Sequence, residues 1–246
     1  MADESLEIDI LEHGAPKDGV PQTSNRRLFM QLLVLEHPSA FDAAVHALQS
    51  RLTQNGVAAV LYADCNNPFR LGLLTFSEDP AHFTTRVHDV IRECNRGGDL
   101  APWTAVPGFS MLGRAYSTGY ESDLQFWLVD RPRETVMHAG WDYGVWYPLK
   151  RKGAFSRLEA REQGAILREH GGIGRAYGAK DYAHDIRLAC HGLDINDNDF
   201  VIGLIGPELH PLSHVVQTMR KTRQTSEFME HMGPFFVGRV IARVGG

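Results

Sequence analysis

His170 is the residue whose setting best suits a metal ligand. It follows Ile166 and Leu167 on the apolar side of a predicted helix, so its imidazole is expected to point inward. The glycine-rich segment 171–174 is expected to end that helix. A histidine so placed can serve the helix C-terminus, bond a carbonyl group in the core, or bind a metal. The local sequence leaves these three roles open.

The distribution of the histidines and cysteines limits which class of metal site the chain can form. The 12 histidines are scattered and no HExxH occurs, while the three cysteines lie far apart and form no CxxC. This argues against a zinc site and against a disulfide framework. A cofactor that takes a single protein ligand, as haem does, is the more economical expectation.

Five cations form a local cluster in a chain whose net charge is −5. Arg131 and Arg133 lie in the segment DRPRET, and Lys150, Arg151 and Lys152 follow a predicted strand. Guanidinium and ammonium groups bind carboxylates, so the cluster suits a ligand with several carboxylate arms. The alternative is a solvated basic strand end. Beside the cluster, the tyrosine at 147 is by default an amphipathic aromatic residue with its hydroxyl at the surface.

The elements that must position these residues form two copies of one pattern. In the first copy, apolar runs predict strands, and apolar spacing at helical period predicts helices between them. The order is strand 26–36, helix 41–52, strands 57–64 and 71–78, helix 83–94 and a strand within 108–120. The second copy is strand 142–150, helix 156–171, strands 185–192 and 199–206, helix 209–220 and strand 234–244.

Each copy has the βαββαβ order of a ferredoxin-like unit. The sequence therefore predicts an α+β fold of tandem ferredoxin-like repeats with antiparallel sheets, in which the bare sheet faces press together or close into a barrel. We expect a mobile or partner-packed arm over 1–25, an N-terminal half over 26–135 and a C-terminal half over 136–246. The space between the sheets is expected to be a natural site for a large planar ligand, unless side chains fill it.

The charge and hydropathy of the chain indicate which partners and which cellular location to expect. The near balance of 25 Lys+Arg against 30 Asp+Glu predicts no general surface for nucleic acid or an anionic membrane. The acidic N-terminus lacks a secretory pattern, and no stretch approaches 18 apolar residues. We expect a soluble, cytoplasmic protein.

Five motifs occur in a fixed order: RPR at 131–133, YP with a basic run, EHGxxGRxY from 169, GLD at 192–194 and GPFFVG at 233–238. This order, over about residues 110 to 243, resembles the chlorite dismutase/coproheme decarboxylase family. The resemblance implies a tandem ferredoxin-like pair, a homopentamer, and haem b or iron-coproporphyrin III (coproheme) held in the C-terminal half.

The resemblance also implies roles for single residues. His170 matches the iron ligand, Arg133 and Ser226 match propionate-binding residues, and Tyr147 matches the tyrosine proposed to relay a one-electron oxidation to a propionate. This tyrosine favours coproheme decarboxylase, an oxidoreductase that forms haem b with hydrogen peroxide. The two lysines at 150 and 152 are expected to hold propionates in register.

The residue expected above the iron departs from the family pattern. That position is Gln in many decarboxylases and Arg in chlorite dismutases, whereas counting along this chain reaches Ala183 or Asp185. Arg187, on the same strand face as Asp185, or His184 could serve instead. Arg187 keeps chlorite dismutation open as an alternative, and a haem-binding sensing or transfer module is a third.

Overall fold

A computed structural model describes residues 7–96 and 101–245. It has the predicted α+β architecture, with every paired strand of the main sheet antiparallel. The elements of the N-terminal half are β3 (Phe29–Glu36), α1 (Phe41–Gln54), β4 (Ala59–Asp64), β5 (Arg70–Ser77), a π-helical turn (Phe83–Val87) that continues as α2 (His88–Arg96), β6 (Thr104–Ala105) and β7 (Met111–Ala115). Those of the C-terminal half are β8 (Tyr143–Arg151), α4 (Ala160–Gly178), β9 (His184–Ala189), β10 (Phe200–Gly206), α5 (Leu209–Met219), α6 (Arg223–Phe228), β11 (Met229–Met232) and β12 (Phe236–Val244).

The strands of both halves join into one closed barrel. Its order is β8–β10–β9–β7–β3–β5–β4–β12 and back to β8. The halves meet where β7 pairs with β9 and where β4 pairs with β12. The duplicated pattern therefore closes into a barrel, one of the two arrangements that the sequence predicts.

Side chains fill the interior of this barrel. Trp146, Tyr62 and Phe236 are fully buried there, together with aliphatic residues from both halves. The expectation of a ligand site between the sheets is therefore wrong, because large aromatic side chains occupy that space. A ligand site on these strands has to lie on their outer faces.

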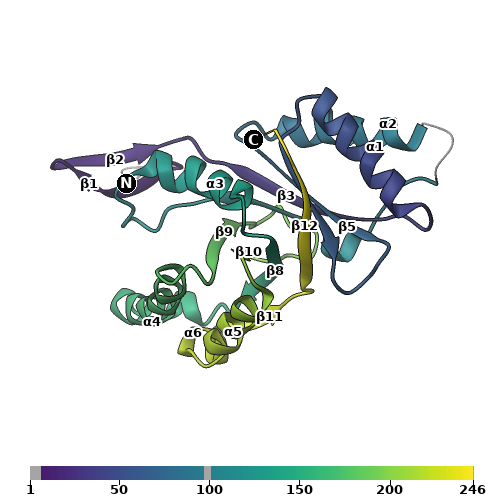
Figure 1. The fold of residues 1–246 in the computed structure, drawn as a ribbon. Helices are drawn as coiled ribbons and strands as arrows, with labels where there is room; N and C mark the ends of the chain where they lie inside the picture. The colour runs from purple at the N-terminus through teal and green to yellow at the C-terminus, as the bar shows by residue number, and fades with distance from the viewer. Residues whose placement is uncertain (1–6, 97–100, 246) are drawn as a thin grey trace.

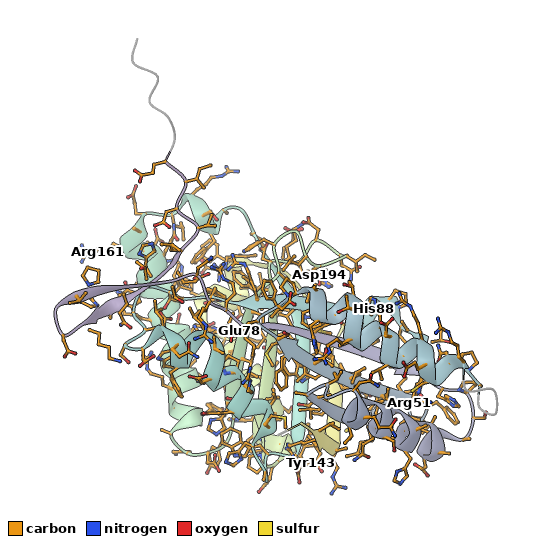
Figure 2. The ribbon with its side chains drawn as sticks, turned by 90° about the horizontal axis from the view of Figure 1, so that it is seen from above. Arg51, Glu78, His88, Tyr143, Arg161 and Asp194 are labelled. Carbon is orange, nitrogen blue, oxygen red and sulfur yellow. The ribbon has the colours of Figure 1, made fainter. Side chains whose placement is uncertain are left out.

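Helices cover the two outer faces at opposite ends of the molecule. In Figure 1, α1 and α2 lie over the N-terminal strands, whereas α4, α5 and α6 lie together on the C-terminal strands. Figure 2 shows the same separation between Arg51 on α1 and Arg161 on α4. Each helical layer has its own apolar core, and that of the C-terminal half contains Tyr147.

Several elements were not predicted from the sequence, α6 and β11 among them. Residues 12–24 form a hairpin, β1 (Glu12–Lys17) and β2 (Val20–Ser24), that packs on its own chain, with Ala15 N–H donating to the Glu121 carbonyl at 2.9 Å. A π-helical turn (Phe126–Asp130) and α3 (Arg131–Met137) follow β7 and place the RPR motif on a helix. The domain boundaries at 25/26 and 135/136 stay predictions.

The helix that carries His170 is longer than predicted. It runs through the glycine-rich segment to Gly178, and none of the glycines at 171, 172 and 174 has a positive φ. The expected break after His170 is therefore wrong, because these glycines adopt helical backbone angles. His170 lies inside the helix instead of at its C-terminus.

Candidate functional site

Three rows of side chains cross the outer face of the C-terminal strands. The strand register aligns Arg187 on β9, Ile202 on β10 and Tyr147 on β8 in one row. Neighbouring rows are Asp185–Leu204–Val145 and Ala189–Phe200–Leu149. Because alternate residues share a face, all of these side chains point towards the helical layer. The face is apolar, with a tyrosine at one edge and an ion pair at the other.

Tyr147 is buried at one edge of this face. Its side chain is 6% exposed, and its ring stacks on Phe235 with centroids 4.5 Å apart. Burial raises the pKa of Tyr147, and the nearby charge of Asp185 raises it further. The residue as a whole is buried, contrary to the default expectation of a surface tyrosine, and Tyr147 is a neutral phenol whose ring lies in an apolar setting.

His170 lies on the stripe of α4 that faces these strands. Ile166, His170, Ile173 and Tyr177 recur at helical spacing, and the three others pack in the apolar clusters of the C-terminal half. The Nδ1 atom of His170 lies 3.3 Å from the hydroxyl oxygen of Thr222. This contact leaves Nε2 as the ring nitrogen available to a ligand.

The charges around His170 keep its imidazole neutral. Burial lowers its pKa, and the positive charges of Arg151 and Arg187 lower it further, against a smaller opposing effect of Asp185. These three charged groups lie on the strand face, close enough to His170 for their charges to act on its imidazole. A neutral imidazole is the form that binds a metal.

Arg151 is the cation that the fold brings to this space from the basic run. It shares the face of β8 with Tyr147, and its guanidinium lies between the rings of Phe155 (4.4 Å) and Phe200 (4.9 Å). Its Nε is buried without a hydrogen-bond partner among the described residues. Burial lowers the pKa of Arg151. A guanidinium with an unsatisfied donor is suited to bind a carboxylate.

At the opposite edge, two guanidinium groups hold Asp185. Its carboxylate accepts a hydrogen bond from Arg131 Nη2 at 2.9 Å and lies 3.1 Å from Arg187 Nε. Burial alone would raise the pKa of Asp185, but the charges of Arg187 and Arg131 outweigh this and lower it. Asp185 and Arg187 therefore form an ion pair opposite His170.

The predicted propionate-binding cations lie elsewhere. Arg133 is exposed and lies over the Phe76 ring at 5.9 Å, because residues two apart on α3 point in different directions and Arg131 faces Asp185. Lys150 points to the other side of β8 and pairs with Asp197 at 2.6 Å. Lys152 is exposed and donates to the Glu227 carbonyl at 2.8 Å.

Two further predicted residues are engaged locally. Ser226 is exposed, and its hydroxyl donates to the Thr222 carbonyl within α6 at 2.9 Å. His184 pairs with Asp181 at 2.8 Å and stacks on Trp141 at 3.7 Å. As the neighbour of Asp185 in β9, His184 points to the opposite face, so the fold does not bring it to His170.

Three residues near the site were not given a role of their own in the sequence analysis. Arg220, at the C-terminal end of α5, lowers the pKa of Tyr147 by its charge and lines an open surface hollow with His231. Strand alternation could have identified Arg151, since it is four residues from Tyr147. No sequence pattern indicates Thr222, because its contact with His170 spans 52 residues.

The donor set fits a planar ligand with acidic arms better than a bare metal ion. The described parts of the chain contain no group of three or more His, Cys, Asp or Glu residues that could hold a metal. The site offers one neutral imidazole, an apolar sheet surface and a half-buried guanidinium whose Nε has no hydrogen-bond partner among the described residues. In the same described parts, none of the helices has the length and apolarity to span a membrane.

A comparison with protein-family models gives a match in the C-terminal half. Residues 130–241 match the family model described as chlorite dismutase. This range contains the whole site: β8, α4, β9, β10 and the segment around Thr222. No protein of curated function matches the chain.

Solved structures share the fold over most of the chain. A haem-binding protein from Thermus thermophilus superposes with a TM-score of 0.67 at 17% identity, covering 88% of this chain and 92% of that one. A variant of the chlorite dismutase from Candidatus Nitrospira defluvii gives 0.64 at 13% identity, covering 89% and 93%. A candidate chlorite dismutase gives 0.68 at 14% identity, covering 88% and 96%. These likenesses establish the tandem ferredoxin-like fold.

Proposed function

We propose that this member of the chlorite dismutase family is a haem-dependent oxidoreductase that converts iron-coproporphyrin III into haem b with hydrogen peroxide. The observation that carries the proposal is the position of Tyr147, a buried phenol on the apolar face that His170 overlooks. A tyrosine is suited to relay single-electron oxidation to a neighbouring substrate group. The solved Thermus thermophilus protein of the same fold is described as haem-binding, which supports the ligand class.

The residues have distinct tasks in this reaction. His170 Nε2 would bind the iron, the apolar strand face would receive the porphyrin, and Arg151 would bind a propionate through its unsatisfied donor. Bound iron supplies the redox chemistry with peroxide. Tyr147 holds its proton on Oη, since burial raises its pKa, so electron and proton leave together.

The overall chemistry balances without a further reactant. Each propionate that becomes a vinyl group loses CO₂ and two hydrogen atoms, and these two hydrogens reduce one H₂O₂ to two H₂O. Two propionates react, so one substrate consumes two H₂O₂. The protein contributes position and the charges that hold the acidic arms.

The test is incubation of apo-protein with iron-coproporphyrin III and hydrogen peroxide, followed by product masses. We expect loss of two CO₂ and four hydrogen atoms. Tyr147→Phe should lower the rate about 100-fold, the scale of a positioned proton-transferring group. Tyr120→Phe, at an 84% exposed tyrosine, is the matched control and should react like the wild type. Unchanged turnover by Tyr147→Phe would refute the relay role.

Chlorite dismutation to chloride and O₂ is the second candidate, and Arg187 is the observation that favours it. Its guanidinium is on the same face and in the same row as Tyr147. Its pairing with Asp185 argues against this function, because the carboxylate offsets the charge that would hold an oxyanion. Oxygen release from chlorite that is lost in Arg187→Ala would assign this function. Porphyrin binding with neither turnover would instead indicate a sensing or transfer module.

A further inference from the structure

Thr222 is the only described residue that makes a polar contact with the imidazole of His170 in this structure. It is 2% exposed, lies at the N-terminal boundary of α6, and its Oγ1 is 3.3 Å from His170 Nδ1. A hydroxyl can donate or accept, so the direction of this bond depends on the other contacts of Thr222.

The hydroxyl proton of Thr222 is used in a hydrogen bond to a group other than His170. Thr222 Oγ1 donates to the Met219 carbonyl at 2.7 Å, the shortest of its contacts. It accepts from the Thr225 backbone N–H at 3.4 Å, which caps α6. The Thr225 hydroxyl oxygen is a second possible acceptor for that proton, but at 3.3 Å it is farther away than the Met219 carbonyl. Because its proton is engaged at the Met219 carbonyl, the Thr222 hydroxyl can only accept from His170, which makes the imidazole the donor through Nδ1–H.

The nearby carboxylates are engaged with other groups. Asp185 is held by Arg131 and Arg187. Glu169, next to His170 in the chain, accepts from the backbone N–H of Arg223 at 3.2 Å. The acceptor for the Nδ1 proton is therefore a neutral hydroxyl rather than a carboxylate.

We propose that Thr222 is a positioning residue that fixes His170 in the Nδ1–H tautomer and leaves the Nε2 lone pair free for iron. The part of this statement that concerns iron rests on the proposed function, whereas the tautomer does not. The partner of a ligating histidine sets its orientation and its strength as an electron donor. A neutral acceptor leaves the imidazole less electron-rich than a carboxylate would.

The first test uses the apo-protein with ¹⁵N-labelled histidine, in which the nitrogen shifts report the tautomer. His170→Gln assigns the signal by its loss. We expect Nδ1–H in the wild type and in Thr222→Ser, which keeps the hydroxyl, and a shift towards Nε2–H in Thr222→Val. A wild-type Nε2–H tautomer, or no change in Thr222→Val, would overturn the proposal.

The second test uses protein loaded with haem b and measures the iron–histidine stretching frequency in the ferrous state. Thr222→Asp keeps a good helix cap but makes the acceptor anionic, so the frequency should rise, whereas Thr222→Val should lower it. The same frequency in all variants would overturn the role towards iron. The correct tautomer without haem binding would refute the proposed function and leave the Thr222 contact intact.

Discussion

Two opposing effects act on the pKa of the Asp185 carboxylate. Its partly buried position raises its pKa, and the two guanidinium groups that bind it lower the pKa by more. In the folded protein Asp185 therefore stays charged to lower pH than in the unfolded chain, where an aspartate has a pKa near 3.9. The stability that this pairing adds is complete above that pH and is lost as the pH falls through the lower folded pKa.

Asp185→Asn should therefore destabilise the protein in a pH-dependent way. We expect a loss on the order of 1 kcal/mol near pH 7, limited by solvent screening of partly exposed groups, that shrinks below about pH 4. Urea unfolding of both proteins across this range measures it. Asp197→Asn, which removes an exposed partner of Lys150, should change little. A difference that grows at acid pH would contradict this account of Asp185.

Tyr147 should resist ionisation at alkaline pH. Its pKa is raised by burial first and by Asp185 second, so the neutral phenol persists above pH 10, where ordinary tyrosines ionise. We expect the tyrosinate absorbance of the wild type and of Tyr147→Phe to rise in parallel up to about pH 11. A wild-type excess of one titrating tyrosine near pH 10 would show that Tyr147 is accessible to water.

The candidate residues differ in how far the sequence could predict them. Helical spacing placed the side chain of His170 towards the core, and the structure agrees. Arg133 was chosen by family resemblance alone, and the segment was not recognised as helical, so the sequence did not reveal that the side chains of Arg131 and Arg133 diverge. Strand alternation could have selected Arg151 over Lys150 and Lys152, because Arg151 shares a strand face with Tyr147, whereas Thr222 required the tertiary fold.

At the scale of elements, α4 shows why glycines mislead. A run of three glycines in four residues is typical of a helix end, since glycine tolerates positive φ and weakens a helix. Here the apolar side of the helix holds it together instead, because Ile173 packs in the cluster of the C-terminal strands and Ile166 packs with Phe155 and Phe228. Helix propensity is a weak prior that tertiary contacts override.

Gly172→Ala tests this directly. Its added Cβ would meet only the end of Arg175 at 4.0 Å, and its backbone is helical, so stability of the apo-protein should rise by about 0.5–1 kcal/mol. Gly56→Ala is the contrasting variant, because Gly56 has a φ of 60° after α1 and alanine is strained there. Thermal unfolding of both variants and of the wild type measures these changes in stability. Destabilisation by Gly172→Ala would indicate that the helix breaks at this segment.

Apolar runs predicted the barrel strands well, because each is buried by the barrel interior on one side and a helical layer on the other. The N-terminal hairpin has few apolar residues and depends on polar contacts with residues 121–123, such as the Lys17–Asp123 ion pair. A pattern of hydrophobicity cannot reveal an element of that kind.

For the whole molecule, barrel closure depends on contacts distant in sequence. The sequence predicted the two copies, but strand pairing between the halves is set by side-chain fit. Trp146 lies in the interior over Gly203 on the adjacent strand β10, where an added Cβ would come within 2.6 Å of its ring. This close approach helps fix the spacing of β8 and β10, the strands that carry Tyr147 and Ile202.

Gly203→Ala should consequently destabilise the barrel. Overpacking of this kind costs about 1–3 kcal/mol, and urea unfolding measures it. Gly153→Ala is the matched control, since no atom lies within 4 Å of its added Cβ and its φ is not positive. Equal stability of the two variants would show that the ring of Trp146 does not constrain the barrel.

The most direct test of the account is a spectroscopic titration of apo-protein with iron-coproporphyrin III. We expect a Soret shift with the wild type and with His210→Ala, which removes an exposed histidine on α5, and an affinity at least about 100-fold weaker for His170→Ala. Equal binding by His170→Ala, or no Soret shift with the wild type, would contradict the central claim that His170 holds the iron.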